Sequence, residues 1–257
     1  MKVWILGSGS GGNAVLVESE GQRLLVDAGF GTRTLARRLA RTGVPPASIE
    51  ACILTHDHSD HVRGAAAAAR KWGWALHATP GTLACRALAD APCSTFTPGS
   101  SLRVGRFDVE TVATPHDATD PVGLLITARG SGARAGICYD VGHASDAVRA
   151  LCREVDVLVL ETNHDEGMLW AGPYPLWLRR RIASDTGHLS NRAAAGLARE
   201  MASRQLAQVV LAHLSEKNNT PELALRAVRA GLRGTAFRGQ VTAAAQDAVA
   251  GPFRPRG

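Results

Sequence analysis

Cysteine is sparse in this sequence and long hydrophobic runs are absent, and both facts restrict the class of protein. The 257 residues include five cysteines, an odd number without a C-x-x-C pair, which fits ordinary buried thiols in a reducing compartment. No apolar stretch approaches the length of a membrane span, and the apolar segment before Gly7 is too short for a signal sequence. We therefore expect a cytoplasmic protein that does not bind membranes.

Lysine is also scarce, because arginine supplies 26 of the 29 basic residues, and the formal net charge is +6. Arginine is suited to bidentate contacts with phosphate, so this charge favours an anionic substrate, nucleic acid included, without separating DNA from a small phosphate ester. The glycine-rich segment 7–13 lacks the lysine of a P-loop and leads into a predicted strand. It therefore predicts a tight loop near the substrate rather than a nucleotide cradle.

The segment from Thr55 to His61 is dense in metal-ligating side chains. It holds three histidines and two further carboxylates in the order T-H-D-H-S-D-H, between an apolar run at 49–54 and an alanine-rich run at 65–72. His56 and His58 alternate along an extended segment and point to one side, whereas Asp60 and His61 lie past the bend. This spacing suits two cations at the ~3.5–4 Å separation of two-metal hydrolytic sites. The alternative is a polar loop whose histidines are merely exposed.

Hydrophobic periodicity predicts two runs of strands, each followed by helices. The predicted strands are 2–6, 14–18, 22–26, 49–54, 74–77, 102–104, 107–112, 122–127, 133–139, 155–160 and 209–211. The predicted helices are 32–42, 65–72, 82–88, 146–152, 177–182, 191–201 and 221–230. This order predicts an α+β fold, an αββα sandwich in which two sheets pack face to face under flanking helices. We expect one domain over 1–250 and a basic, disordered tail at 251–257.

Further polar residues follow the later predicted strands. The candidates beyond the histidine cluster are His116, Asp140, Glu161, His164, His188 and His213. Asp27 ends the third predicted strand, where a carboxylate is placed to brace the histidine loop. His143 lies in the loop after Asp140. Because these residues belong to segments far apart in the chain, they form one site only if the strand ends meet.

The chain resembles the hydrolases of the metallo-β-lactamase superfamily over nearly its whole length, on the H-x-H-x-D-H cluster and the downstream candidates. The resemblance implies a first metal held by His56, His58 and His116. It implies a second metal held by Asp60, His61 and His213, with Asp140 bridging the two. No cysteine is a ligand in this set, so two divalent cations of zinc, manganese or iron are expected.

Four longer motifs look like those of the YycJ (WalJ) group within this superfamily. They are ETNHD at 161–165, GPYP at 172–175, DTGHLSN at 185–191 and HLSEKNN at 213–219, and the opening GSGSGGN at 7–13 fits too, with Gly11 where serine or a similar small residue is usual. The resemblance implies a metal-dependent DNA 5′ exonuclease in which a hydroxide bridging the metals attacks phosphorus. The substrate contacts that we predict are Ser10, Asn13, Asn163, His164, Tyr174, Ser215 and Asn218 in these motifs, and Arg181 in the arginine run that precedes DTGHLSN.

Glu161 and His188 occupy places like the glutamate and histidine of the tRNase Z motifs. This likeness implies that His188 protonates the leaving oxygen and that Glu161 orients it. We also predict that Asp60 helps to orient the attacking hydroxide. The alternative for His188 is a helix-start histidine bonded within the fold. The alternative for His164 is a residue that supports a ligand side chain and does not touch substrate. The run Arg179 to Arg181 predicts either phosphate contact or a solvated helix face.

Three other functions remain open at this point. A small-molecule (cyclic) phosphodiesterase of the PhnP type shares the turn that carries His188. A glyoxalase II-like thioester hydrolase uses the same seven ligands but needs no general acid. A scaffold protein is disfavoured, because buried histidines and aspartates without a ligand are costly. Neither a β-CASP insertion nor the long arm of tRNase Z is evident, which disfavours RNA maturation. The oligomeric state and a partner other than nucleic acid are not predicted.

Overall fold

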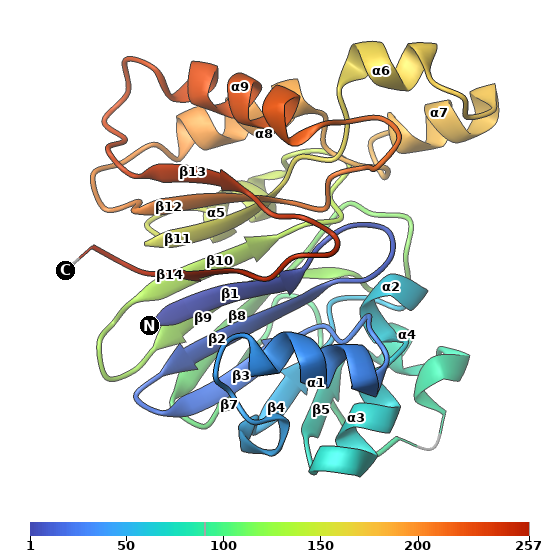
Figure 1. The fold of residues 1–257 in the computed structure, drawn as a ribbon, viewed down its shortest axis with the longest axis vertical. Helices are drawn as coiled ribbons and strands as arrows, with labels where there is room; N and C mark the ends of the chain where they lie inside the picture. Colours follow the sequence, from blue (N-terminus) through green and yellow to red (C-terminus); the bar gives the residue numbers. More distant parts are fainter. Residues whose placement is uncertain (90, 257) are drawn as a thin grey trace.

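Two β-sheets of seven strands each form the centre of the computed structural model, which describes residues 1–89 and 91–256 (Figure 1). The first sheet runs in the order β14 (Ala250–Phe253), β1 (Lys2–Gly7), β2 (Ala14–Ser19), β3 (Gln22–Val26), β4 (Ala51–Ile53), β5 (Ala75–Ala78) and β6 (Cys93–Thr95). The second runs in the order β13 (Gln240–Ala243), β12 (Gln208–Ala212), β11 (Val157–Glu161), β10 (Arg134–Cys138), β9 (Val122–Ala128), β8 (Phe107–Ala113) and β7 (Ser101–Val104).

Helices cover the outer face of each sheet (Figure 1). The helices that follow strands of the first sheet are α1 (Thr32–Ala40), α2 (Ser59–Val62), α3 (Ala65–Trp72) and α4 (Pro80–Leu83). Those that follow strands of the second are α5 (Asp146–Leu151), α6 (Glu166–Ala171), α7 (Leu176–Ile182), α8 (Asn191–Glu200) and α9 (Pro221–Leu232). Short 3₁₀ turns occur at Pro46–Ser48 and Arg86–Leu88. The predicted αββα sandwich is confirmed.

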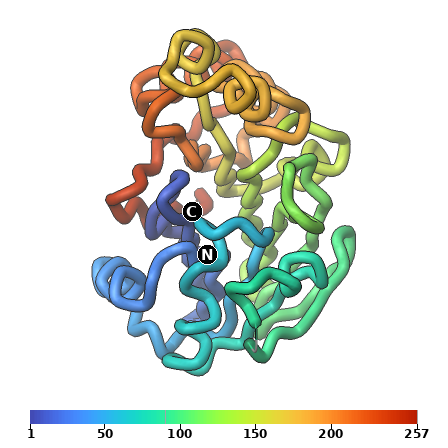
Figure 2. The backbone as a smooth tube through the Cα atoms, turned by 90° about the vertical axis from the view of Figure 1, so that its right-hand side faces the viewer, coloured from blue at the N-terminus to red at the C-terminus, as the bar shows by residue number. Residues whose placement is uncertain are grey.

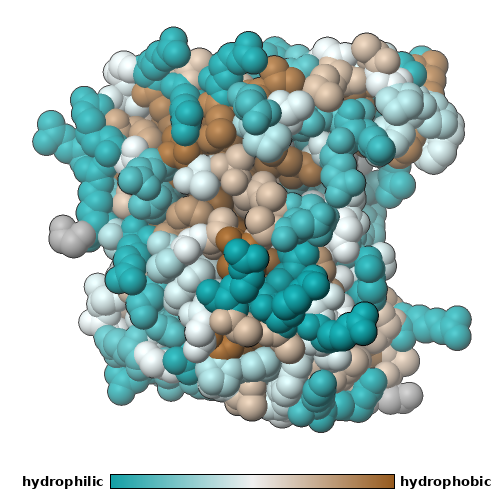
Figure 3. All heavy atoms as spheres, viewed as in Figure 1, coloured by the Kyte–Doolittle hydropathy of each residue, from teal (hydrophilic) through white to brown (hydrophobic). Residues whose placement is uncertain are grey.

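Three apolar layers hold these elements together. Phe107 and Val159 are fully buried in the layer between the sheets. Leu39 of α1 packs with the outer face of the first sheet, and Leu197 of α8 packs with the outer face of the second. The opposite face of α1 exposes Arg33, Arg37 and Arg41, and Figure 3 shows hydrophilic side chains gathered over this helix. The amphipathic pattern of the helices therefore decides which side meets a sheet.

Each sheet is antiparallel in one half and parallel in the other. Strands β3 to β6 are parallel in the first sheet, and β10 to β13 are parallel in the second. The carboxyl ends of parallel strands meet at one edge of a sheet, which is where open α/β sheets bind their ligands. The fold therefore brings the loops after β3, β4, β10, β11 and β12 to the same edge.

The predicted tail is wrong in its first half, because residues 250–253 form β14. This strand pairs with β1, matching Val3 with Phe253 and Ile5 with Ala250, and the Phe253 side chain is buried. A Gly-Pro pair inside the segment hides the strand from a propensity argument. Its pairing covers the edge of β1, which would otherwise leave backbone groups unpaired. Gly257 lies outside the described residues.

Several shorter elements also differ from the predicted ones. The predicted helix 82–88 is replaced by α4 and the turn Arg86–Leu88, while β6, α6 and β13 were not predicted. These are short elements with no clear period in their residues. Helices α6 and α7 form a projection beyond the sheets, visible at the upper right of Figure 1 and at the top of Figure 2. In the part of the chain that the structure describes, none of the helices is long and apolar enough to cross a membrane.

Candidate metal centre and active site

The candidate ligands lie at the ends of strands, and at three of these ends the backbone turns sharply. Asp27 follows β3, Asp140 lies two residues beyond β10, and His213 follows β12. Their φ angles are 60°, 57° and 54°, in the left-handed region that non-glycine residues rarely adopt. Unusual backbone conformations of this kind persist only where the surroundings enforce them, and they cluster at functional sites. The turns aim all three side chains across the edge where the sheets meet.

The first group of ligand atoms comes from His56, His58 and His116, and these atoms lie within 4.8 Å of one another. His116 Nε2 is 3.3 Å from His58 Nδ1. The other ring nitrogen of His116 lies 3.1 Å from the Gly187 carbonyl, and His56 Nδ1 lies 3.1 Å from Thr55 Oγ1. Burial lowers the pKa of both His56 and His116, which favours the neutral ring that binds metals.

The second group joins Asp60, His61 and His213. Asp60 Oδ2 lies 3.3 Å from His61 Nε2 and 3.5 Å from His213 Nε2. The opposite nitrogen of each ring faces a buried carboxylate: His61 Nδ1 is 2.7 Å from Asp27 Oδ2, and His213 Nδ1 is 3.1 Å from Glu161 Oε1. A carboxylate on one ring nitrogen fixes the tautomer and directs the other nitrogen toward a metal.

Asp140 lies between the two groups. Its Oδ2 is 3.1 Å from His61 Nε2 in the second group, and its Oδ1 is 3.8 Å from His116 Nε2 in the first. The contact between Asp140 Oδ2 and His61 Nε2 lacks hydrogen-bond geometry, so within the described residues both Asp140 Oδ2 and His56 Nε2 are buried without a hydrogen-bond partner. Unsatisfied buried polar atoms are costly, and a divalent cation would satisfy both. The donor set of nitrogen and oxygen atoms thus fits the divalent metals expected from the sequence.

Asp27 braces the histidine loop, as predicted. Its carboxylate is buried and accepts hydrogen bonds from the Thr55 amide (2.8 Å), the Thr55 hydroxyl (2.9 Å) and the Tyr139 hydroxyl (2.6 Å), in addition to its contact with His61. Burial lowers the pKa of His61, but the carboxylates of Asp140, Asp27 and Asp60 more than offset it, and the pKa lies well above its ordinary value. Sequence reasoning missed Tyr139, whose hydroxyl only the fold brings to Asp27.

The Asp27→Asn variant is expected to bind metal about 10–100-fold more weakly. The side-chain amide of asparagine would place an N–H donor where Asp27 Oδ2 now meets the hydroxyl donors of Thr55 and Tyr139. It would donate to His61 Nδ1, which would then have to be unprotonated. That tautomer places the proton on Nε2, the atom that faces Asp60 and Asp140. Asparagine tolerates the left-handed backbone, so strain does not confuse the result.

Metal affinity of this variant is measured by chelator competition. Tyr139→Phe is the matched control, because it removes one donor to Asp27 and leaves the His61 contact. It should lose about 1 kcal/mol of stability and keep its metal. Unchanged affinity in Asp27→Asn would contradict the tautomer argument.

Glu161 joins the metal centre to His188. Its Oε1 lies 2.7 Å from His188 Nδ1, and its Oε2 accepts from the Val141 and Leu189 amides at 2.8 and 3.2 Å. Burial raises the pKa of Glu161, but His188 and His213 outweigh it and bring the pKa to about 2. Burial also lowers the pKa of His188, and the carboxylates of Glu161 and Asp140 raise it above its ordinary value. The pair therefore holds a proton on His188 beside the centre.

A cavity of about 190 Å³ opens over the metal groups. It is lined by Ser10, His58, Asp60, Asp117, Asp140, Leu178, Arg181, Ile182, Gly187, His188 and His213. Of the predicted substrate contacts, Ser10 and Arg181 lie here. The sequence analysis missed Asp117, which forms an ion pair with Arg181, and the two apolar residues of α7. The sequence shows that Asp117 directly follows His116, but it does not show that Asp117 pairs with Arg181.

The other predicted substrate contacts lie outside this cavity. Asn13, Asn163, His164 and Asn218 are buried, and buried side chains reach a substrate only if the protein rearranges. The Asn13 amide lies 3.2 Å from Asp60 Oδ2, and the Asn163 amide donates to the His213 carbonyl at 3.0 Å, so both hold ligand segments.

Tyr174 and Ser215 also lie outside the cavity. Tyr174 precedes α7, and its carbonyl accepts from Arg179. Ser215 Oγ accepts from the amides of Lys217 and Asn218 at 3.4 and 3.2 Å, which shapes the loop after His213. His143 Nδ1 contacts the Asp185 carbonyl at 2.9 Å and is not among the cavity-lining residues. These contacts shape the loops around the cavity.

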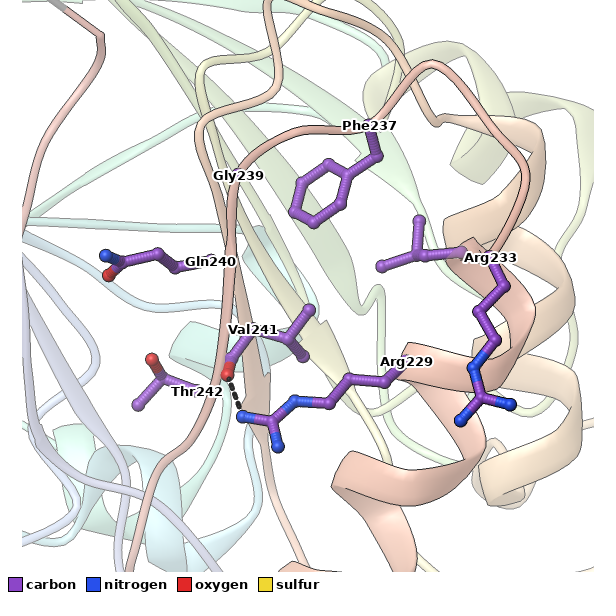
Figure 4. A pocket seen from close by; sticks show the side chains of 8 residues that line it. Arg229, Arg233, Phe237, Gly239, Gln240, Val241 and Thr242 are labelled. Carbon is purple, nitrogen blue, oxygen red and sulfur yellow. Dashed lines mark hydrogen bonds between the residues drawn. The ribbon is translucent and has the colours of Figure 1, made fainter.

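A larger pocket of about 550 Å³ lies away from the metal groups, between α9 and β13 (Figure 4). Arg229 reaches across it and donates to the Val241 carbonyl at 3.1 Å, and Phe237 stands over the space (Figure 4). No histidine or carboxylate is among its lining residues in the described chain. It therefore carries no hydrolytic chemistry, and the smaller cavity is the candidate active site.

Comparison with known proteins identifies the family. A model described as the beta-lactamase superfamily domain matches residues 22–214. The chain belongs to the β-lactamase superfamily. Exodeoxyribonuclease WalJ of Streptococcus pneumoniae serotype 2 is 33% identical over 87% of this chain and 85% of that protein. Exodeoxyribonuclease YycJ of Bacillus anthracis is 30% identical over 91% of this chain and 89% of that protein.

A solved structure supports the fold independently. The metallo-β-lactamase fold protein YhfI from Bacillus subtilis has a TM-score of 0.70 at 20% identity and covers 97% of this chain and 99% of its own. The predicted resemblance to the YycJ (WalJ) group is confirmed by the two sequence relatives. As a member of this superfamily with the ligand clusters in place, the protein is a metal-dependent hydrolase that binds divalent metal.

Proposed function

We propose that the protein is a DNA 5′ exonuclease that holds two divalent cations, zinc or manganese, in the cytoplasm as a single domain. The observation that carries the proposal is the Glu161–His188 pair beside the ligand groups, in which Glu161 Oε1 lies 2.7 Å from His188 Nδ1. A phosphodiester needs a proton for its leaving oxygen, and this pair supplies a held proton at the cavity wall. Two relatives named exodeoxyribonuclease support DNA as the substrate.

The residues take the following roles in this proposal. His56, His58 and His116 would hold the first cation, Asp60, His61 and His213 would hold the second, and Asp140 would be shared between them. When bound, the cations would lower the pKa of water and neutralise charge on the phosphoryl oxygens. Glu161 keeps the proton of His188 Nδ1, so that Nε2 delivers its proton to the leaving oxygen. Arg181, at the cavity wall, contacts a phosphate of the substrate.

The remaining hydrolase functions explain this site less well. A thioester has a good thiolate leaving group and requires no buried carboxylate–histidine pair at the cavity wall. A small-molecule phosphodiesterase would use the pair, but its substrate would not need the arginines on α7 beyond the cavity. The relatives that cover most of this chain at 30% identity or more carry an exonuclease name. The nuclease is therefore the function that accounts for both the pair and the resemblance.

The test uses metal-reconstituted protein on end-labelled DNA, single- and double-stranded, with 5′-phosphate or 5′-hydroxyl ends. Mn²⁺ and Zn²⁺ are compared, and a sample treated with chelator is the control. We expect stepwise release from the 5′ end that stops when the metal is removed and returns when it is restored. The thermal midpoint should fall on chelation too, since a ligand at 100 times its Kd stabilises the folded state by about 2.7 kcal/mol.

Two other results would redirect the assignment. Turnover of bis(p-nitrophenyl) phosphate without degradation of DNA would indicate the small-molecule phosphodiesterase. Degradation of RNA at the same rate as DNA would leave the nuclease but remove the preference for DNA. Absence of both activities in a protein with full metal content would contradict phosphodiester hydrolysis altogether and return attention to thioesters.

A further inference from the structure

The projection formed by α6 and α7 concentrates the exposed large apolar side chains of the protein. Trp170 is 47% exposed, Leu176 is 52% exposed and Trp177 is 66% exposed, and these are the large hydrophobic residues found exposed in the described chain. All three lie within eight consecutive positions. Tryptophan is rarely left this open without a reason, since it buries more apolar area than almost any other residue when covered.

Arg179 holds the two tryptophan-bearing segments in a fixed relation. Its guanidinium donates to the Tyr174 carbonyl, before α7, and to the Trp170 carbonyl, within α6. The bond to Trp170 connects the two helices, which lie side by side in both views of the backbone (Figures 1 and 2). Because the acceptors are carbonyls and not carboxylates, the charge of Arg179 is not neutralised. A fixed surface loses little conformational entropy when it binds a ligand.

The charge of this surface favours an anion. Arg180 is exposed and, like Arg179, has no carboxylate within ion-pair distance among the described residues. The nearby acidic groups are already engaged: Glu166 pairs with Arg192, and Asp165 caps α6 by accepting from the Met168 amide. The projection therefore carries two guanidinium groups without a carboxylate partner and two exposed tryptophans.

The same helix reaches the active site. Leu178, Arg181 and Ile182 line the catalytic cavity at the i, i+3, i+4 spacing of one helix face. Trp177 and Arg180, each one residue earlier than a cavity residue, are exposed outside it. A polymer whose terminal phosphate lies in the cavity would therefore continue over α7 and meet these side chains.

We propose that the α6–α7 projection binds single-stranded DNA, with bases stacked on Trp170 and Trp177 and backbone phosphates held by Arg179 and Arg180. This inference rests on the proposed nuclease function and names the form of substrate that it handles. Aromatic stacking with flanking cations is how proteins bind single strands without sequence preference. Bases within a duplex are already stacked on one another and cannot cover an indole face, so the surface selects a single strand or a frayed 5′ end.

The test compares the double variant Trp170→Ala/Trp177→Ala with Leu176→Ala. The control removes an equally exposed apolar side chain of the same helix that has no aromatic face. For an oligothymidylate longer than about 16 nucleotides, the loss of each ring should raise KM about fivefold. The two effects multiply, so KM of the double variant should rise about 25-fold. KM for a blunt duplex and turnover of bis(p-nitrophenyl) phosphate should change less than about twofold, and so should KM of Leu176→Ala. Trp177→Tyr should restore most of the single-ring loss, because tyrosine also stacks.

Each remaining outcome decides against the surface or against the nuclease. Wild-type kinetics in the double variant would overturn the inference while leaving the nuclease intact. An equal rise of KM in Leu176→Ala would show that the surface makes a general apolar contact. A double variant that sediments differently from the wild type while its KM is unaltered would show that the surface is an interface between copies of the chain. If the wild type degrades no DNA, the proposed nuclease function is wrong. A fluorescence titration still tests the surface: oligothymidylate should quench tryptophan fluorescence in the wild type, and this quenching should be lost in the double variant.

Discussion

The Asp60→Ala variant is expected to cleave DNA about 10³-fold more slowly than the wild type and to lose metal from one of two sites. Asp60 Oδ2 lies within 3.5 Å of ring nitrogens on both His61 and His213, so it completes the second ligand group. Without this carboxylate, two buried imidazoles would face a dication with less anionic charge to offset it. Metal content by atomic emission and release of labelled nucleotide are the two readouts.

Asp57 is the matched control for this variant. It lies in the same loop, three residues earlier, but its carboxylate accepts from the amide and hydroxyl of Thr119 at 3.1 and 3.3 Å and belongs to neither ligand group that we assign to the metals. Asp57→Ala should therefore keep its metal and lose little activity. Equal loss in both variants would mean that the loop, rather than the ligand, was damaged. Full activity in Asp60→Ala would exclude the second metal from the chemistry.

Replacement of His188 by alanine is expected to lower turnover of DNA by about 10²–10⁴-fold while metal content stays unchanged. The proton on His188 is held by Glu161, and the ring lines the cavity. His188 clusters with Asp140, Glu161 and His213, outside the two groups of three ligands that we assign to the metals. Losing the ring would remove the proton source for the leaving oxygen and would leave every ligand in place. The loss should be smaller for a substrate with a p-nitrophenolate leaving group, which departs without protonation.

His143→Ala is the control for this second variant. His143 contacts the Asp185 carbonyl at 2.9 Å in a neighbouring loop and does not line the cavity. Its activity should match the wild type. If His188→Ala loses metal in proportion to activity, the histidine supports the centre and is not the acid. If both DNA and nitrophenyl substrates slow equally, the proton goes elsewhere.

Burial is what separates this centre from an ordinary polar loop. His61, Asp140 and Glu161 are almost completely enclosed, and groups of opposite charge face each of them. Burial disfavours a charged carboxylate, but the surrounding histidines outweigh it and hold the pKa of Asp140 well below its ordinary value. An ionised carboxylate is the form that binds a divalent cation. The enclosure and the ligand chemistry therefore support each other.

The sequence by itself determined the architecture and the candidate ligands, because both depend on local patterns. Alternating and apolar runs predict the strands, and the ends of those strands carry His116, Asp140, Glu161 and His213. Since carboxyl ends of parallel strands share one sheet edge, residues far apart in the chain were expected at one place. The histidine cluster needed no fold at all, for its spacing alone predicts two metals.

Only the tertiary structure decided the surroundings of those ligands. Gln246 accepts from the Gly11 amide at 2.6 Å and donates to the Gly12 carbonyl at 2.9 Å, which fixes the glycine-rich loop from the far end of the chain. The burial of Asn13 and Asn218 and the pairing of Asp117 with Arg181 likewise depend on neighbours from other segments. A local pattern records which side chains a segment offers. It does not record which distant residues these side chains will bond or whether solvent will reach them. Those contacts decide which predicted substrate residues reach the cavity and which support its walls.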